Sequence, residues 1–215
     1  MPNTHQILLA SLLGLMLAAP AHAGRPLTVD DASVNEAGAG HVEAWYARLP
    51  GRAHTWTVAP AYAPIDGLEL GAAISRDRTA NATSGAVQAK WRITPSQESG
   101  CNVGAVLGVA HTRGAGGNTP YVNGLATCNS GWGASHFNLG AVHAPGESTL
   151  GTWGIAHERE FGRVTAHVEA FGQRHSKPTF QVGARMEVAK GLQIDGTVGR
   201  SDRENLVSVG LKQSF

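Results

Sequence analysis

Apolar and polar residues alternate along most of this chain, and short turn-like stretches interrupt the alternation at regular intervals. After Gly40, segments of about ten residues are separated by stretches such as PIDG, RGAGGN and SDREN. A period of two is typical of a β-strand with one apolar and one polar face. The pattern predicts about twelve strands, near residues 41–49, 53–63, 67–76, 85–94, 101–112, 119–129, 135–144, 150–159, 163–173, 178–188, 192–201 and 206–215.

The two faces are clearest in the segments AVQAKWRI, RVTAHVEA and TFQVGARMEV, where apolar residues alternate with charged or amide side chains. A soluble sandwich would turn the apolar face inward, whereas a membrane barrel turns it toward lipid. Periodicity alone does not choose between them. Hairpin follows hairpin without a crossover of Greek-key length, which favours the barrel. No apolar run after residue 23 reaches the ~18 residues of a spanning helix.

The last strand, NLVSVGLKQSF, supports the same interpretation. Its apolar residues fall on one parity and end on an aromatic, as in the terminal strand that bacterial outer-membrane proteins present to the barrel assembly machinery; Gln213 departs from that pattern. An even number of strands places both termini on the periplasmic side. We therefore expect an antiparallel transmembrane β-barrel over residues 40–215, with eight or ten strands as alternatives to twelve. The matching residues are Phe215, Leu211, Val209 and Val207.

The chain begins with a segment typical of export. An apolar run from Ile7 to Ala19 is followed by Ala21-His22-Ala23, a small-residue cleavage pattern. We expect residues 1–23 to be a signal peptide, cut before Gly24, and the protein to lie in the outer membrane of a Gram-negative bacterium.

Charge and histidine spacing give little support to other classes of function. The net charge of +1 offers no argument for nucleic acid. The histidines show no ligand spacing with Cys or carboxylates, so we expect no metal and no cofactor. The expected partners are outer-membrane lipids, the barrel assembly machinery and a small-molecule solute; the sequence does not set an oligomeric state.

Two cysteines, Cys101 and Cys128, fit an oxidising compartment. They could form a disulfide or remain two unpaired small residues. With RGAGGN at the tip of the hairpin, the two cysteines fall directly opposite each other. The register therefore favours a disulfide at the periplasmic rim.

Hairpin turns also predict which inward residues meet. A turn centred on residues 203–204 places Asp195 opposite Lys212. A turn centred on Lys190 places Arg185 opposite Asp195, and one centred on Ser176 places His167 opposite Arg185. Glu169 and Glu187 then lie diagonal to Arg185, while Glu69 faces Arg92 and Gly71 faces Lys90.

The expected inward charges are nearly balanced, and their signs interleave. Opposite charges across a sheet stabilise it, so these residues can be internal structural pairs. Alternatively, they line a narrow polar path; a wide, strongly ion-selective pore would want one sign in excess. The predicted lumen-lining residues are Glu43, Glu69, Lys90, Arg92, His167, Glu169, Arg185, Glu187, Asp195 and Lys212.

The start of the mature chain resembles a family of proteobacterial outer-membrane barrels grouped with phenol-degradation (meta-cleavage) pathways. The resemblance implies an outer-membrane location and passage of small, aromatic or hydrophobic compounds. It covers about a tenth of the chain and rests on Gly24, Arg25, Pro26, Leu27, Asp30, Asp31, Ala32, Glu43 and Trp45.

Residues 24–39 lack strand alternation and are polar. They could form a disordered periplasmic tail, or they could enter the barrel and plug it. For a plug, Arg25, Asp30 and Asp31 are the candidate residues, and the two aspartates would meet Lys90 or Arg92.

An outer-membrane lipid-modifying enzyme is the main rival to a channel. The nearest features are His175 beside Ser176, and Ser135 beside His136 and Asn138. Neither matches the Ser/His motifs of outer-membrane phospholipases or deacylases, so we expect no enzyme. A closed structural barrel is a further alternative, and the short expected loops disfavour adhesion.

Overall fold

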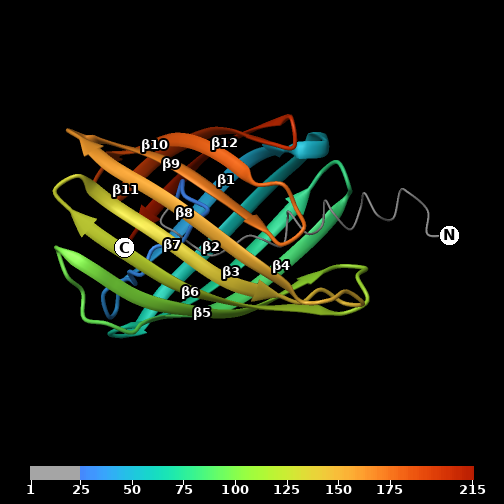
Figure 1. Ribbon diagram of the computed structural model, residues 1–215, viewed down its shortest axis with the longest axis horizontal. Helices are drawn as coiled ribbons and strands as arrows, with labels where there is room; N and C mark the ends of the chain where they lie inside the picture. Colours follow the sequence, from blue (N-terminus) through green and yellow to red (C-terminus); the bar gives the residue numbers. More distant parts are fainter. Residues whose placement is uncertain (1–24) are drawn as a thin grey trace.

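The computed structural model describes residues 25–215, and the predicted signal peptide lies outside them. Twelve antiparallel strands close into a barrel, as the alternation predicted (Figure 1). None of the helices in residues 25–215 is long and apolar enough to cross a membrane. The strands are β1 Gly40–Leu49, β2 Ala53–Ile65, β3 Leu68–Asp77, β4 Ala82–Arg92, β5 Gly100–Thr112, β6 Asn118–Ser130, β7 Gly133–Val142, β8 Leu150–Phe161, β9 Val164–Gln173, β10 Thr179–Ala189, β11 Leu192–Ser201 and β12 Glu204–Ser214, with one short 3-10 turn, η1 Pro50–Arg52.

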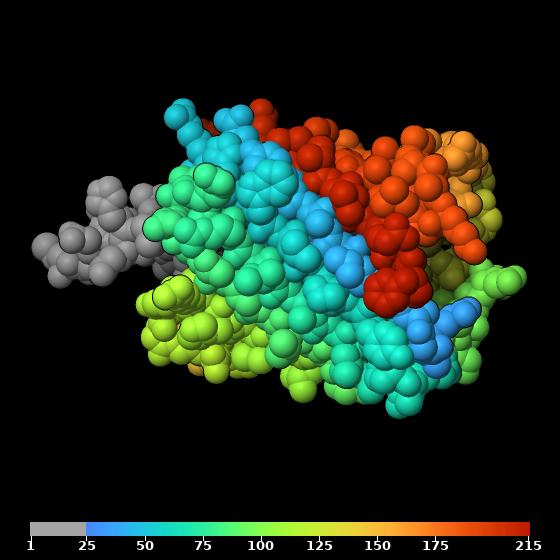
Figure 2. Space-filling view, turned by 180° about the vertical axis from the view of Figure 1, so that it is seen from behind, coloured from blue at the N-terminus to red at the C-terminus, as the bar shows by residue number. Residues whose placement is uncertain are grey.

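Each strand pairs with its neighbours in sequence, and β1 pairs with β12 to close the sheet. Figure 2 shows this seam on the outer surface, where the last strand, in red, lies against the first strands, in blue and cyan. Phe215 extends the seam, because its N–H donates to Gly40 O and Gly40 N–H donates to Phe215 O, both at 2.9 Å.

We call the end that holds the start of β1 and the end of β12 the terminal end. It also carries the turns at 66–67, 93–99, 131–132, 162–163 and 190–191. The other end, which we call the distal end, carries the turns at 50–52, 78–81, 113–117, 143–149, 174–178 and 202–203. All the connections are short, so little chain lies outside the sheet.

Large apolar side chains cover the outside of the barrel. Trp56, Leu139 and Val198 are 56%, 75% and 56% exposed, whereas the inward neighbours of Trp56, Thr55 and Thr57, are buried. This inverts the arrangement of a soluble sandwich and is the pattern of a sheet whose outer face meets lipid.

Three predicted registers are wrong by two residues. Asp195 lies opposite Gly210 rather than Lys212, because the turn consists of Asp202 and Arg203, both with positive φ. Likewise His167 faces Gly183 rather than Arg185, and Glu69 faces Lys90 rather than Arg92, so Gly71 faces Gln88. The predicted pair of Arg185 and Asp195 is confirmed. A shift of two leaves each side chain on its predicted face.

Candidate functional site

The beginning of the described chain lies inside the barrel. Val29 and Asp30 are 1% and 0% exposed, and Arg25 is 8% exposed, although none of them belongs to a strand. Their contacts are inward side chains of strands around the barrel wall. We call residues 25–35 the lumen segment. Of the two alternatives for residues 24–39, these contacts fit a segment that enters the barrel.

Arg25 ties one end of the lumen segment to the wall. Its Nη2 lies 2.8 Å from Oδ1 of Asp195 and 3.2 Å from the Ser208 hydroxyl, and its guanidinium lies 4.6 Å from the centre of the Trp45 ring. Gly210 makes room for it, since a Cβ there would lie 2.6 Å from Arg25 Nε. The acid on β11 therefore meets the segment instead of Lys212.

Two aspartates form a second tie, to β4. Lys90 Nζ lies 2.8 Å from Asp30 Oδ1 and 3.1 Å from Asp31 Oδ1, and Lys90 is 2% exposed. Burial acts to raise the pKa of the Asp31 carboxyl, but Lys90 beside it holds that pKa below its usual range. Arg92, the other base proposed for these aspartates, instead binds Asp66 at 2.7 Å in the turn after β2.

Backbone N–H groups of the lumen segment supply further ties. Glu169 accepts hydrogen bonds from the N–H groups of Thr28 and Val29 at 2.9 and 2.8 Å. Asn138 both accepts from Asp30 N–H and donates to Asp30 O, each at 2.7 Å. Further N–H donors bind Glu43 (from Arg25), Thr127 (from Ala32) and Glu69 (from Asn35). Since main-chain groups make these contacts, inward acids remain bonded whatever side chains the segment carries.

Apolar side chains of the segment fill two patches of the lumen wall. Leu27 and Val29 pack on Ala156 and Phe171. Ala32 packs on Val106, Leu125 and Tyr121. Together with the charged ties, these contacts fix the segment across the lumen.

The remaining predicted lumen residues form separate contacts. Glu43 Oε1 lies 3.8 Å from Lys212 Nζ, and His167 Nε2 lies 3.8 Å from Glu169 Oε1. Arg185 binds Glu158 at 2.5 Å, an acid that the sequence reasoning missed. The alternation could have predicted this acid, because Glu158 lies two residues after the inward Ala156 on the same strand.

Glu187 does not join the other acids and bases inside the barrel. It is exposed, and its carboxylate accepts the Gly191 N–H in the turn after β10 at 2.9 Å. Asn138 and Thr127, which the sequence reasoning also missed, are uncharged but occupy inward positions. A prediction based on pairs of opposite charges does not include uncharged residues.

Charges are unevenly distributed along the lumen. Of the inward acids and bases that contact the segment, Glu43, Glu69, Lys90 and Asp195 lie toward the terminal end, and Glu169 lies in the middle of β9. At the distal end, the described inward residues are small or uncharged apart from two acids. Asp77 Oδ1 accepts the N–H groups of Thr79 and Ala80, and Glu204, opposite Ser201 at the start of β12, accepts the Gly51 N–H. The distal wall includes Ala53, Thr55, Thr57, Ser75, Ser84, Thr112, Thr119, Thr179 and Ser201.

The predicted disulfide is present. Cys101 and Cys128 lie directly opposite each other on β5 and β6 and are bonded. They lie near the terminal end of the hairpin, away from its 113–117 turn. The bond therefore clamps the two strands where the 93–99 turn joins β4 to β5.

The Ser and His features have a partner that the sequence reasoning did not foresee. Ser135 Oγ lies 3.0 Å from Nδ1 of His157, whose Nε2 lies 3.2 Å from the Trp132 carbonyl. Ser135 is in the middle of a hydrogen-bonded sheet, with β6 on one side and β8 on the other. The neighbouring N–H groups serve the strand ladder, so this pair lacks the preorganised donors that acyl transfer uses.

One family model matches most of the chain. The model of the family described as "Uncharacterised conserved protein UCP029691" matches residues 11–214. No curated protein sequence matches the chain.

Several solved structures similar to this one are described as porins or channels. A KdgM porin superposes with a TM-score of 0.67 at 13% identity, covering 81% of this chain and 99% of that one. The KdgM porin in complex with disordered oligogalacturonate gives 0.68 at 12% identity over 82% and 99%. The COG4313 outer membrane channel from Pseudomonas putida F1 gives 0.63 at 9% identity over 86% and 98%. At these identities the likeness establishes the fold.

Proposed function

We propose that this chain, which belongs to the family described as Uncharacterised conserved protein UCP029691, is a passive outer-membrane channel for small molecules whose lumen is closed by its own residues 25–35. The observation that carries the proposal is the lumen segment itself. A barrel that served as structure alone would not need a separate segment held inside its lumen. Here the wall presents acids and bases to a segment that is continuous with β1 but is not part of the sheet.

The position of the charges supports a narrow path. Asp195, Glu169, Glu69 and Lys90 bind the segment, so its departure would leave both signs facing the lumen. Because these acids outnumber the base three to one, such a wall would pass small cations and uncharged solutes in preference to anions.

For the solute, we propose a small compound without net charge. The resemblance to meta-cleavage pathway barrels suggests an aromatic or hydrophobic one, and the Ala, Thr and Ser side chains of the distal wall are compatible with it. A strongly charged solute would find two charged inward residues there, the acids Asp77 and Glu204, among those that the structure describes.

The test is single-channel conductance of the refolded chain from Gly24 in a planar bilayer, compared with a variant that lacks residues 25–35. Refolding of each is checked by heat-dependent mobility in gels. We expect conductance to appear or to rise several-fold in the deleted variant.

Swelling of vesicles that contain the deleted variant then ranks solutes. Neutral aromatic compounds should enter faster than anions of equal size. Absence of conductance in both refolded proteins would overturn the channel proposal and leave a closed barrel, for which lipid hydrolysis is the next assay.

A further inference from the structure

Basic side chains accumulate at the distal end. The six distal turns, with two flanking strand residues on each side, carry nine bases against four acids. The same count over the five terminal-end turns gives three bases and four acids. The distal bases are Arg48, Arg52, Arg76, Arg78, Arg113, Arg174, Lys177, Arg200 and Arg203, and the acids are Asp77, Glu147, Asp202 and Glu204.

Three of these bases point away from the lumen. Arg48, Arg76 and Arg200 each occupy the second-to-last position of a strand, β1, β3 and β11. Their inward neighbours Ala47, Asp77 and Ser201 are 5%, 4% and 4% exposed, whereas the three arginines are exposed. Since strand side chains alternate, the arginines face the outside of the barrel.

Strands β1, β3 and β11 lie close together, because the order of strands in this part of the sheet is β3, β2, β1, β12, β11. The outward arginines therefore follow one arc of the distal rim. With Arg52, in the turn between β1 and β2, we call them the arginine arc.

Exposed aromatic rings flank this arc. Trp56 lies opposite Arg76 in the β2–β3 register, and Phe180 lies opposite Arg200 in the β10–β11 register. The two rings are 56% and 58% exposed on the outer face. Exposed aromatic side chains of this kind mark the level where lipid chains give way to headgroups. The arginines therefore lie at headgroup depth.

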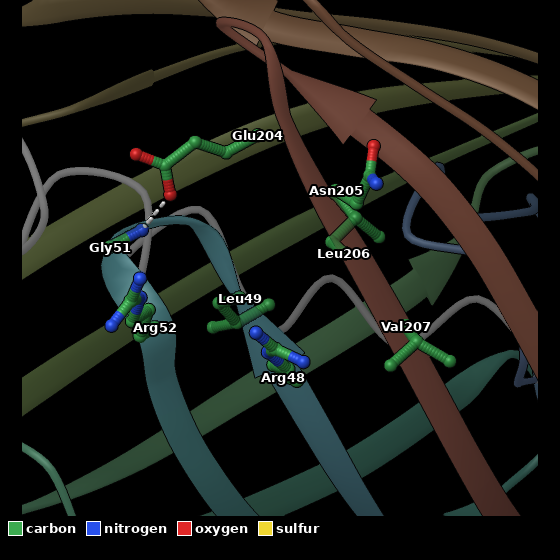
Figure 3. Close-up of a pocket in the computed structure, with 8 residues that line it drawn as sticks. All are labelled: Arg48, Leu49, Gly51, Arg52, Glu204, Asn205, Leu206 and Val207. Atoms are coloured by element: carbon green, nitrogen blue, oxygen red, sulfur yellow. Dashed lines mark hydrogen bonds between the residues drawn. The ribbon is translucent and has the colours of Figure 1, made fainter.

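A pocket of about 540 Å³ lies within the arc, between the β1–β2 turn and the start of β12. Arg48, Arg52 and Glu204 line it (Figure 3). The Glu204 carboxylate accepts the Gly51 N–H, which ties the acid to the turn. Within residues 25–215, Arg48, Arg52 and Arg200 have no ion-pair partner. The pocket thus offers two unpaired guanidinium groups to an anion.

We propose that the arginine arc binds the phosphate groups of outer-leaflet glycolipid, with lipid A as the ligand class. Guanidinium groups bind phosphate through paired N–H donors. Their outward direction beside exposed aromatics assigns them to lipid, because a solute in the lumen would not meet them. The inference rests on the outer-membrane location proposed above, with the distal end facing outward.

The test is binding of lipid A in mixed detergent micelles to the refolded protein, with phosphate-free lipid A as the reference lipid. The triple variant Arg48→Gln, Arg76→Gln, Arg200→Gln is compared with Arg92→Gln, Arg163→Gln, Lys190→Gln, which removes the same charge from the terminal end. Loss of three of the four arginines of the arc should weaken binding about tenfold or more. The control triple should change it by less than about twofold.

Equal weakening by both triples, or equal binding of the phosphate-free lipid, would overturn the proposal. So would full competition by inorganic phosphate, because it would assign the arc to soluble anions. Both triples must first show the heat-dependent mobility of the folded barrel. Conductance of the deletion variant does not enter this assay, so failure of the channel proposal and failure of lipid binding are distinguishable.

Discussion

Two wall glycines, Gly210 and Gly154, lie where side chains of the lumen segment press against the barrel. A Cβ at Gly210 would lie 2.6 Å from Arg25 Nε, and one at Gly154 would lie 2.8 Å from Val29 Cγ2. The absence of a side chain there lets the segment approach the strands closely. At the scale of single residues, the wall is fitted to the segment that it holds.

The first prediction concerns Gly210. Replacing Gly210 with Ala should displace Arg25 at a cost of about 1 to 3 kcal/mol in segment docking, and measurable conductance should follow. Gly196→Ala is the matched control, because its Cβ would meet ordinary contacts at 3.5 Å or more. The conductance of the two variants is compared in planar bilayers. Identical conductance would contradict the close contact between Gly210 and Arg25.

The second prediction tests the ion pair of Arg25 and Asp195. Arg25→Asp and Asp195→Arg should each open the channel, since an unpaired buried charge costs about 3 to 5 kcal/mol. The double swap restores opposite charges and should return conductance toward the wild-type level. Failure of the double variant to close, although it folds, would show that the pair does not hold the segment.

At the scale of elements, alternation and turn composition sufficed to predict the strands, but not all the registers. Every predicted strand is present, because a period of two is a property of sequence alone, but Glu187, expected in the lumen, is exposed at the end of β10. Register depends on which turn residues adopt positive φ, and Asp202, Arg203 and Asn81 do so without being glycine. Those conformations shifted the expected partners by two positions.

In the candidate site, too, some contacts could be predicted from the sequence and others could not. Lys90 contacts Asp30 and Asp31, which charge complementarity suggested. The partner of Arg25 could not be foreseen, because the path of a segment without secondary structure depends on the shape of the lumen. Asn138 and Thr127 bind main-chain groups, and no pattern in side-chain charge points to such contacts.

A third prediction concerns the β5–β6 hairpin. The Cys101–Cys128 bond spans a sequence separation of 27 residues, which corresponds to about 3 to 4 kcal/mol of unfolded-state restriction. Replacing both cysteines with Ser should lower the urea midpoint of unfolding in lipid vesicles. Reductant should lower the wild-type midpoint to the same value and leave the variant unchanged; a reductant effect on the variant would refute this assignment.

At the scale of the whole molecule, closure depends on a single seam between β1 and β12. Phe215 contributes backbone hydrogen bonds to Gly40, and its ring is 68% exposed on the outside. The backbone can therefore close the seam without the ring, and the ring remains available to an assembly partner.

The fourth prediction separates these two roles. Phe215→Ala should refold spontaneously into lipid vesicles to the same heat-modifiable barrel, because the backbone bonds persist. Its insertion by the reconstituted barrel assembly machinery should slow several-fold, and a chain that lacks residue 215 should be impaired in both assays. Unchanged assisted insertion of Phe215→Ala would refute the proposed role as an assembly signal.

The hydrogen bonds of the lumen segment determine how the barrel can open. Its N–H groups are bonded to Glu43, Glu169, Asn138, Thr127 and Glu69, so the ties run along its whole length. If part of the segment left the lumen, several buried acids and amides would lose their hydrogen-bond donors together. Opening should therefore be cooperative, and a graded stimulus would change how often the barrel switches between two discrete current levels, while the size of each level stays fixed.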